Sequence, residues 1–166
     1  MFKKITLTIC ILFCSGIIGD PTSMDHPERK IRELNPKDSE WLERSNKIGY
    51  DILDWYNKNK ELNPGTLDSA FQKWKSDKTD NKAPENLVAV GLGSLFGKYI
   101  KDHKRCRWVV VTDSFGTDFA LLNETGSELY PINSVWKRID SSNQDISFFE
   151  PIWTSVVEKE FENSSK

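Results

Sequence analysis

Three side chains in the second half of the chain have the chemistry of general acid–base catalysis: His103, Asp113 and Asp118. Such groups move a proton only when they lie within hydrogen-bond reach of the reacting atom. Ser114 follows Asp113 directly, so a Ser–His–Asp triad can be written down, but adjacent Asp and Ser are more typical of a tight turn. A small hydrolase-like enzyme that uses His103, Asp113 or Asp118 is therefore the alternative function, not the first.

Metal and cofactor chemistry has weaker support. A zinc site needs three or four clustered ligands, whereas the chain has only His26 and His103, and Cys106 is the one cysteine beyond position 14. The glycines from Gly91 to Gly97 superficially resemble a phosphate-binding loop, but they follow no predicted strand and lack the lysine–hydroxyl pair of such loops. We expect no metal and no cofactor.

A binding surface is the first interpretation. Asp113 and Gly116 delimit a four-residue turn, and the cationic pair Lys137 and Arg138 follows the predicted strands. Loops and charges of this kind often carry recognition. The sequence thus predicts a non-enzymatic domain that binds a protein partner through Asp113, Gly116, Lys137 and Arg138. One specific version is an immunity-like protein that neutralises a toxin.

The N-terminus has the order of a secretory signal peptide. Lys3 and Lys4 precede the apolar run 5–18, which is shorter than the roughly 20 residues that a membrane-spanning helix needs. We expect residues 1–19 to be removed and the protein to be exported to the periplasm or envelope. Cys14 follows Ile11 and Leu12 as in a lipoprotein signal, although Phe13 stands where that signal usually has a small residue. A lipid on Cys14 is therefore the alternative and the only expected membrane attachment.

Composition narrows the partners further. The chain carries 23 Lys and Arg against 25 Asp and Glu, and its net charge of −2 does not favour general nucleic-acid binding. Six tryptophans argue for a packed core rather than a disordered chain.

The elements that must position these residues form one α+β domain. We expect a proline-containing linker at 20–37 and a single domain at 38–162, with N-terminal helices, a short antiparallel three-stranded meander and C-terminal helices. The predicted helices cover 38–57, a shorter stretch from Thr66, and 84–102, and the strands cover 108–111, 119–122 and 128–130. Two helices follow, at 133–138 and 145–161.

Glycines inside the third predicted helix need a reason, because each costs about 1 kcal/mol relative to alanine. Gly93 and Gly97 are four positions apart and therefore lie on one face of the helix. We expect this helix to be central and to use these glycines for close packing.

Three segments, VAVGLGSLFGKYI, RWVVVTDSFGTDFAL and YPINSVWKRI, resemble a bacterial family of unknown function, domain-of-unknown-function family 3806. The resemblance covers residues 87–140 and implies a shared fold and a matching surface, but no reaction. The matching positions are Gly91, Gly97, Trp108, Asp113, Gly116, Pro131, Lys137 and Arg138.

Overall fold

The computed structural model describes residues 29–58, 61–140 and 145–161. The expected signal peptide and the candidate lipidation site Cys14 lie outside these ranges. Within them, no helix combines the length and the apolar character that crossing a membrane requires.

The described chain is a mixed α+β fold, as predicted, with one antiparallel sheet of four strands in the order β1-β2-β3-β4. The expected meander is present as β2 (Cys106–Asp113), β3 (Gly116–Asn123) and β4 (Glu128–Leu129). The sheet has one strand more than predicted, because β1 (Lys30–Glu33) comes from the segment interpreted as a linker and pairs with β2. All four residues of β1 are exposed, so this edge strand has no buried period that a sequence pattern could reveal.

The two turns of the meander follow the predicted chemistry. The backbone N–H of Phe115 donates to Asp113 Oδ1 at 2.7 Å, and Gly116 closes the turn with a φ of +135°, which favours glycine. In the second turn the N–H of Ser127 donates to Asn123 Oδ1 at 2.7 Å. Short-range side-chain bonds therefore set both turns.

Two N-terminal helices begin two to three residues earlier than predicted. Helix α1 (Pro36–Asn57) is capped by Asn35 and helix α2 (Pro64–Ser76) by Asn63. Asp38 and Thr66, which the sequence suggested as starting points, close each capping box from inside the first turn. Proline directly after each cap supplies the helical φ and needs no hydrogen-bond donor.

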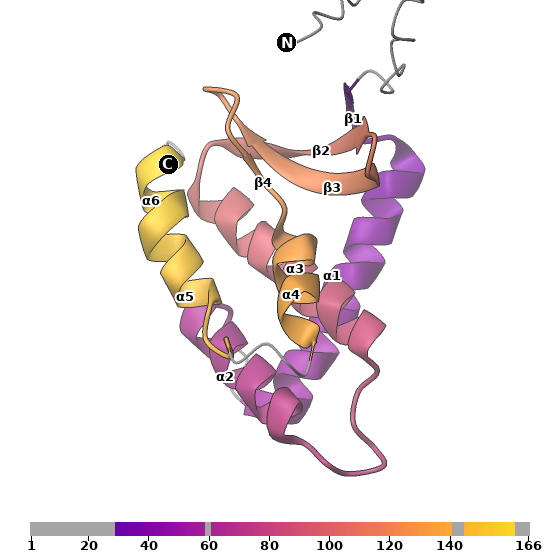
Figure 1. Cartoon of the computed structure of the whole chain (residues 1–166), viewed down its shortest axis with the longest axis vertical. Coiled ribbons are helices and arrows are strands. Elements are labelled where there is room, and N and C mark those ends of the chain that lie inside the picture. The colour runs from indigo at the N-terminus through magenta and orange to yellow at the C-terminus, as the bar shows by residue number, and fades with distance from the viewer. Residues whose placement is uncertain (1–28, 59–60, 141–144, 162–166) are drawn as a thin grey trace, which may run out of the picture.

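Helix α3 (Glu85–His103) is the central helix, flanked by α1 and α4 (Pro131–Ile139) below the sheet (Figure 1). A Cβ on Gly93 would lie 2.5 Å from the Cα of Ile132, and one on Gly97 would lie 2.1 Å from the ring of Trp108. The predicted close packing at Gly93 and Gly97 is therefore confirmed. The partners are α4 and a tryptophan of β2.

The C-terminal helix begins at Phe149 rather than at Asp145. It consists of α5 (Phe149–Ile152), a π-helical turn η1 (Trp153–Val157) and α6 (Glu158–Glu160). Its start is fixed by the buried carboxylate of Asp68 on α2, which accepts hydrogen bonds from the N–H groups of Phe148, Phe149 and Glu150.

The same helix α2 also fixes the end of α4. Lys75 Nζ donates to the carbonyl oxygens of Arg138, Ile139 and Asp140 at 2.6–2.9 Å, and burial lowers the pKa of this ammonium group. Opposite charges on one helix thus satisfy the carbonyl end of α4 and the N–H end of α5.

Candidate functional site: two grooves along one helix pair

The residues of the enzymatic alternative do not come together. His103 ends α3, where its Nδ1 lies 2.7 Å from the carbonyl oxygen of Tyr99 and its ring packs against those of Tyr99 and Trp153. Asp113 lies at the opposite end of β2, and a strand of this length is roughly 25 Å long. Asp118 lies near Asp113 on β3, opposite Val111. The three groups therefore form no shared site.

The residues of the predicted binding surface lie in two separate places. Asp113 and Gly116 form the tip of the β2–β3 hairpin, where the ring of Phe115 is 96% exposed. Lys137 and Arg138 lie in the last turn of α4, which leads away from the sheet (Figure 1).

Arg138 has a structural role that the sequence did not indicate. Its Nε donates to Asp145 Oδ2 at 2.7 Å, its Nη1 donates to the carbonyl oxygen of Ser134, and its guanidinium lies 4.4 Å from the centre of the Phe148 ring. These contacts tie α4 to the segment before the C-terminal helix.

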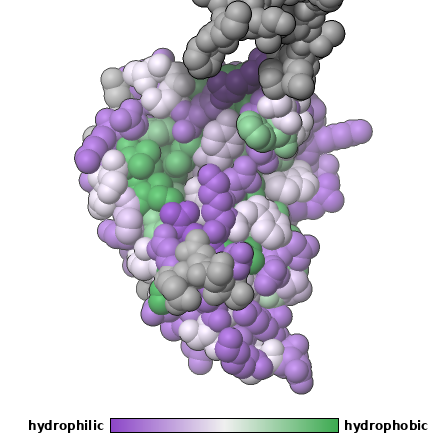
Figure 2. Space-filling view, in the orientation of Figure 1, coloured by the Kyte–Doolittle hydropathy of each residue, from purple (hydrophilic) through white to green (hydrophobic). Residues whose placement is uncertain are grey.

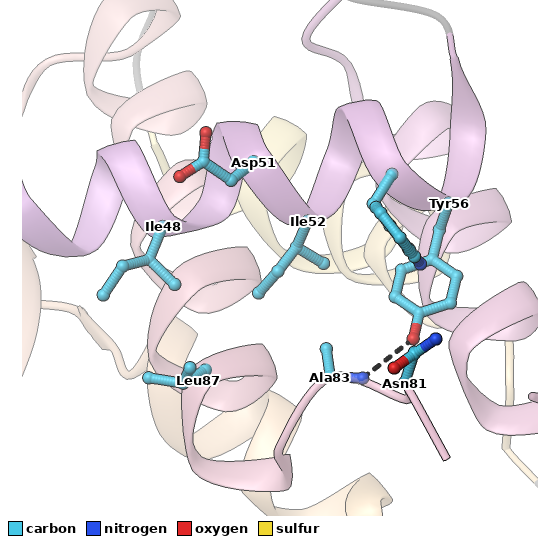
Figure 3. A pocket seen from close by; sticks show the side chains of 8 residues that line it. Ile48, Asp51, Ile52, Tyr56, Asn81, Ala83 and Leu87 are labelled. Carbon is cyan, nitrogen blue, oxygen red and sulfur yellow. Dashed lines mark hydrogen bonds between the residues drawn. The ribbon is translucent and has the colours of Figure 1, made fainter. Parts of the chain in front are cut away.

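The first concave site of the molecule is an apolar groove between the second half of α1 and the start of α3. It has a volume of about 310 Å³. In Figure 3, Ile48 and Ile52 extend from α1 toward Ala83, just before α3, and Leu87 in the first turn of α3. The apolar groove is lined by Ile48, Asp51, Ile52, Trp55, Tyr56, Asn81, Ala83 and Leu87.

One end of the apolar groove is held rigidly by Tyr56. Its hydroxyl donates to Asp77 Oδ2 at 2.9 Å. It also accepts from the N–H of Ala83 at 3.0 Å, as Figure 3 shows. The carbonyl oxygen of Ala83 in turn accepts from the indole N–H of Trp74 at 2.8 Å. Burial raises the pKa of Tyr56, and the hydrogen bond from the Thr79 backbone lowers that of Asp77.

Two large apolar side chains at the rim of the apolar groove are exposed to solvent. Trp55 is 65% exposed and Leu87 is 38% exposed, although both lie beside the buried Ile52. An apolar concavity with an exposed tryptophan at its rim can take up an apolar side chain from another molecule.

The second concave site is a polar groove between the first half of α1 and the last turns of α3. Its volume is about 340 Å³, its floor includes Leu42 and Trp108, and charged side chains of both signs form its walls. Lys98 donates to Asp102 at 2.5 Å, and this hydrogen bond raises the pKa of Lys98. The polar groove is lined by Leu34, Ser39, Leu42, Glu43, Asn46, Lys98, Lys101, Asp102 and Trp108.

A single close contact separates the two grooves. A Cβ on Gly49 of α1 would lie 2.4 Å from the carbonyl oxygen of Gly91 on α3, so the two backbones touch at this point. Each groove lies along the helix pair on one side of that crossing. Sequence analysis singled out Gly91 but not Gly49, and a glycine in the interior of a predicted helix was the signal that could have indicated the contact.

Two other chemistries have little support in the described chain. No group of three or more His, Cys, Asp or Glu side chains within residues 29–58, 61–140 and 145–161 is arranged to hold a metal ion. Cys106 is half-buried, and burial raises its pKa to about 11, so its thiol stays protonated at neutral pH.

Residues 66–147 match the model of the family described as domain of unknown function DUF3806. The match is consistent with a DUF3806 domain over this segment of the chain. The match confirms the family that the sequence resembles and extends it beyond 87–140 to include most of α2, with Asp68 and Lys75. Helix α1 precedes the DUF3806 domain, so each groove has one wall inside the domain and one outside it.

A solved structure shows a similar fold. A crystal structure from Bacteroides thetaiotaomicron VPI-5482 has a TM-score of 0.53 and 10% sequence identity to this chain. The similarity covers 76% of this chain and 47% of the other, so it spans about half of that protein. No curated protein matches the sequence.

Proposed function

We propose that the protein is an exported, non-enzymatic binding domain whose apolar groove holds a bulky apolar side chain of a protein partner. The observation that carries this proposal is Trp55, which is 65% exposed at the rim of a groove lined by Ile48, Ile52 and Leu87. Tryptophans beside preformed apolar pockets are frequent energetic centres of protein interfaces. The bonds of Tyr56 hold the groove in shape before a partner arrives, which lowers the entropy cost of binding.

Polar residues line part of the apolar groove, and the face of the molecule shown in Figure 2 is mostly hydrophilic. On this face, an apolar area lies between α4 and the C-terminal helix. Asp51 and Asn81 place polar groups around the apolar groove. A mixed rim of this kind orients a partner while the apolar centre supplies most of the binding energy.

Export is the second part of the proposal. It is supported by Lys3, Lys4 and the apolar run that follows them, and it places the protein in the periplasm or envelope, with a lipid on Cys14 as the variant. An acidic, exported binding domain also suits an immunity-like role against a toxin. Mass spectrometry of the native protein is expected to find a new N-terminus near residue 14 or residue 20, and an intact Met1 would contradict export.

Site-specific photo-crosslinking tests the groove. A photoreactive phenylalanine analogue at position 55 is expected to capture one discrete partner in living cells. The same analogue at Tyr50, an exposed aromatic position of α1 outside the groove, is the matched control. Equal products from both positions, or none from position 55, would contradict binding in the apolar groove.

Catalysis by His103, Asp113 or Asp118 can be tested separately. Neither groove is lined by His103, Asp113 or Asp118, so no observation favours catalysis by these residues. A hydrolase activity that disappears on replacement of any one of them would restore that alternative.

A further inference from the structure

The polar groove has the charge arrangement of a small-molecule site. Lys98 and Asp102 pair with each other along α3. Of the other charged lining residues, Glu43 belongs to α1 and Lys101 to α3, so one anion and one cation extend from opposite walls. A ligand with a single charge would meet a like charge on one wall, whereas a ligand with both charges can pair with each wall.

The floor of the same groove is apolar. Leu42 and the ring of Trp108 are both largely buried there, and the ring of Trp108 packs against Gly97, which fixes its position. A ligand that fits this groove therefore has an apolar body as well as two opposite charges.

Asn46 adds an unsatisfied polar group to the wall formed by α1. Its Oδ1 is buried and has no hydrogen-bond partner among the described residues. A buried carbonyl oxygen without a partner destabilises the folded protein. Rotation of the whole Asn46 side chain toward the groove would bring this oxygen within reach of an N–H group of a ligand.

We propose that the polar groove binds a free α-amino acid with a bulky apolar side chain. Lys101 pairs with the carboxylate, Glu43 and Asn46 receive the ammonium group, and the side chain lies on Leu42 and Trp108. This site is separate from the apolar groove, from which the Gly49–Gly91 contact divides it.

Titration of the ¹⁵N-labelled protein with L-phenylalanine tests the proposal, because each groove contains its own tryptophan. The indole N–H signal of Trp108 is expected to shift saturably, while that of Trp55 stays in place. L-phenylalanine amide and N-acetyl-L-phenylalanine each lack one charge and are expected to bind about tenfold more weakly. Equal binding of the blocked compounds, a response of Trp55 instead, or no saturable shift would overturn the proposal.

Two variants test which side chain pairs with each charge of the ligand. Lys101→Gln is expected to remove the preference for L-phenylalanine over its amide, and Glu43→Gln the preference over the N-acetyl compound. The exposed Lys47→Gln and Glu40→Gln, on α1 but outside the groove, are matched controls and should keep both preferences. Variants with wild-type spectra that also keep both preferences would overturn the assignment. Loss of the crosslink at position 55 has no bearing on these measurements, so the two proposals can fail independently.

Discussion

The apolar and the polar groove are built from the same two helices and differ in almost everything else. Both lie between α1 and α3, on either side of the Gly49–Gly91 contact. The apolar groove has an exposed tryptophan at its rim and one acidic side chain, whereas the polar groove has a buried tryptophan in its floor and two cationic and two anionic side chains in its walls. One close crossing can therefore create two concavities, and the side chains beyond it decide what each can bind.

Breaking the crossing should give the largest effect. In Gly49→Val, the new side chain would collide with the backbone of Gly91, and we expect a loss of about 3 kcal/mol in the free energy of unfolding. Both grooves should change together, seen as shifts of the Trp55 and Trp108 indole signals. Urea unfolding of Gly65→Ala, a helical glycine with an ordinary contact distance of 3.4 Å, is the control and should differ little from wild type. Unchanged stability of Gly49→Val would show that the helices do not touch there.

Removal of the exposed tryptophan should separate binding from folding. Trp55→Ala is expected to weaken the crosslinked partner's affinity by about 2 kcal/mol, as at an interface hot spot. Its unfolding free energy should stay within about 0.5 kcal/mol of wild type, because the side chain is mostly exposed. Calorimetric titration and urea unfolding measure the two quantities. A large loss of stability would mean that Trp55 serves the fold instead.

Removal of the Tyr56 hydroxyl oxygen should loosen one end of the apolar groove. Tyr56→Phe leaves the N–H of Ala83 without its acceptor and Asp77 without one donor, so we expect a loss of about 1–2 kcal/mol in unfolding free energy. Tyr50→Phe, on the exposed side of α1, should be neutral. The Trp108 signal of the polar groove is expected not to move in either variant. If it moves in Tyr56→Phe, the two grooves are coupled through the helix pair.

Acid should weakly destabilise the end of the apolar groove at Tyr56 and Asp77. The pKa of Asp77 lies below 3.8 in the folded protein, chiefly because of the hydrogen bond from the Thr79 backbone. The unfolded chain therefore takes up this proton first, so the contribution of Asp77 is present above pH 3.8 and is lost as the pH falls through the folded value. Comparison of the pH dependence of unfolding for wild type and Asp77→Asn measures it. Identical slopes below pH 4 would contradict this assignment.

Local chemistry in the sequence predicted much of the fold. The turns at Asp113–Gly116 and Asn123–Gly126, the three meander strands and the close packing of Gly93 and Gly97 depend on neighbouring residues or on one helix face. Strand β1 was not predicted, because Lys30–Glu33 lies at an exposed edge of the sheet and is mostly charged. The helix starts were predicted too late because Asp38 and Thr66 are not the capping residues. Each lies in the first turn, where its side chain accepts a hydrogen bond from the backbone of the true cap.

The candidate sites were less accessible to sequence analysis. Each groove depends on how α1 crosses α3, and the contact between Gly49 and Gly91 joins residues 42 positions apart (91 − 49). The partners of Arg138 were also missed, because the pair with Lys137 looked like a single exposed feature. In the structure Arg138 contacts Asp145 and Phe148, which the sequence placed simply in the next helix.

The hydrogen bonds that Asp68 of α2 accepts from the C-terminal segment have a consequence for the order of folding. Asp68 receives the N–H group of Phe148 from 80 positions away, so the C-terminal helix is completed only after a long stretch of chain has closed. Contacts of such high sequence separation tend to form late and to open early. The amides of Phe148 and Phe149 should then exchange with solvent faster than those of Leu92 and Leu95, although all four residues are fully buried at rest.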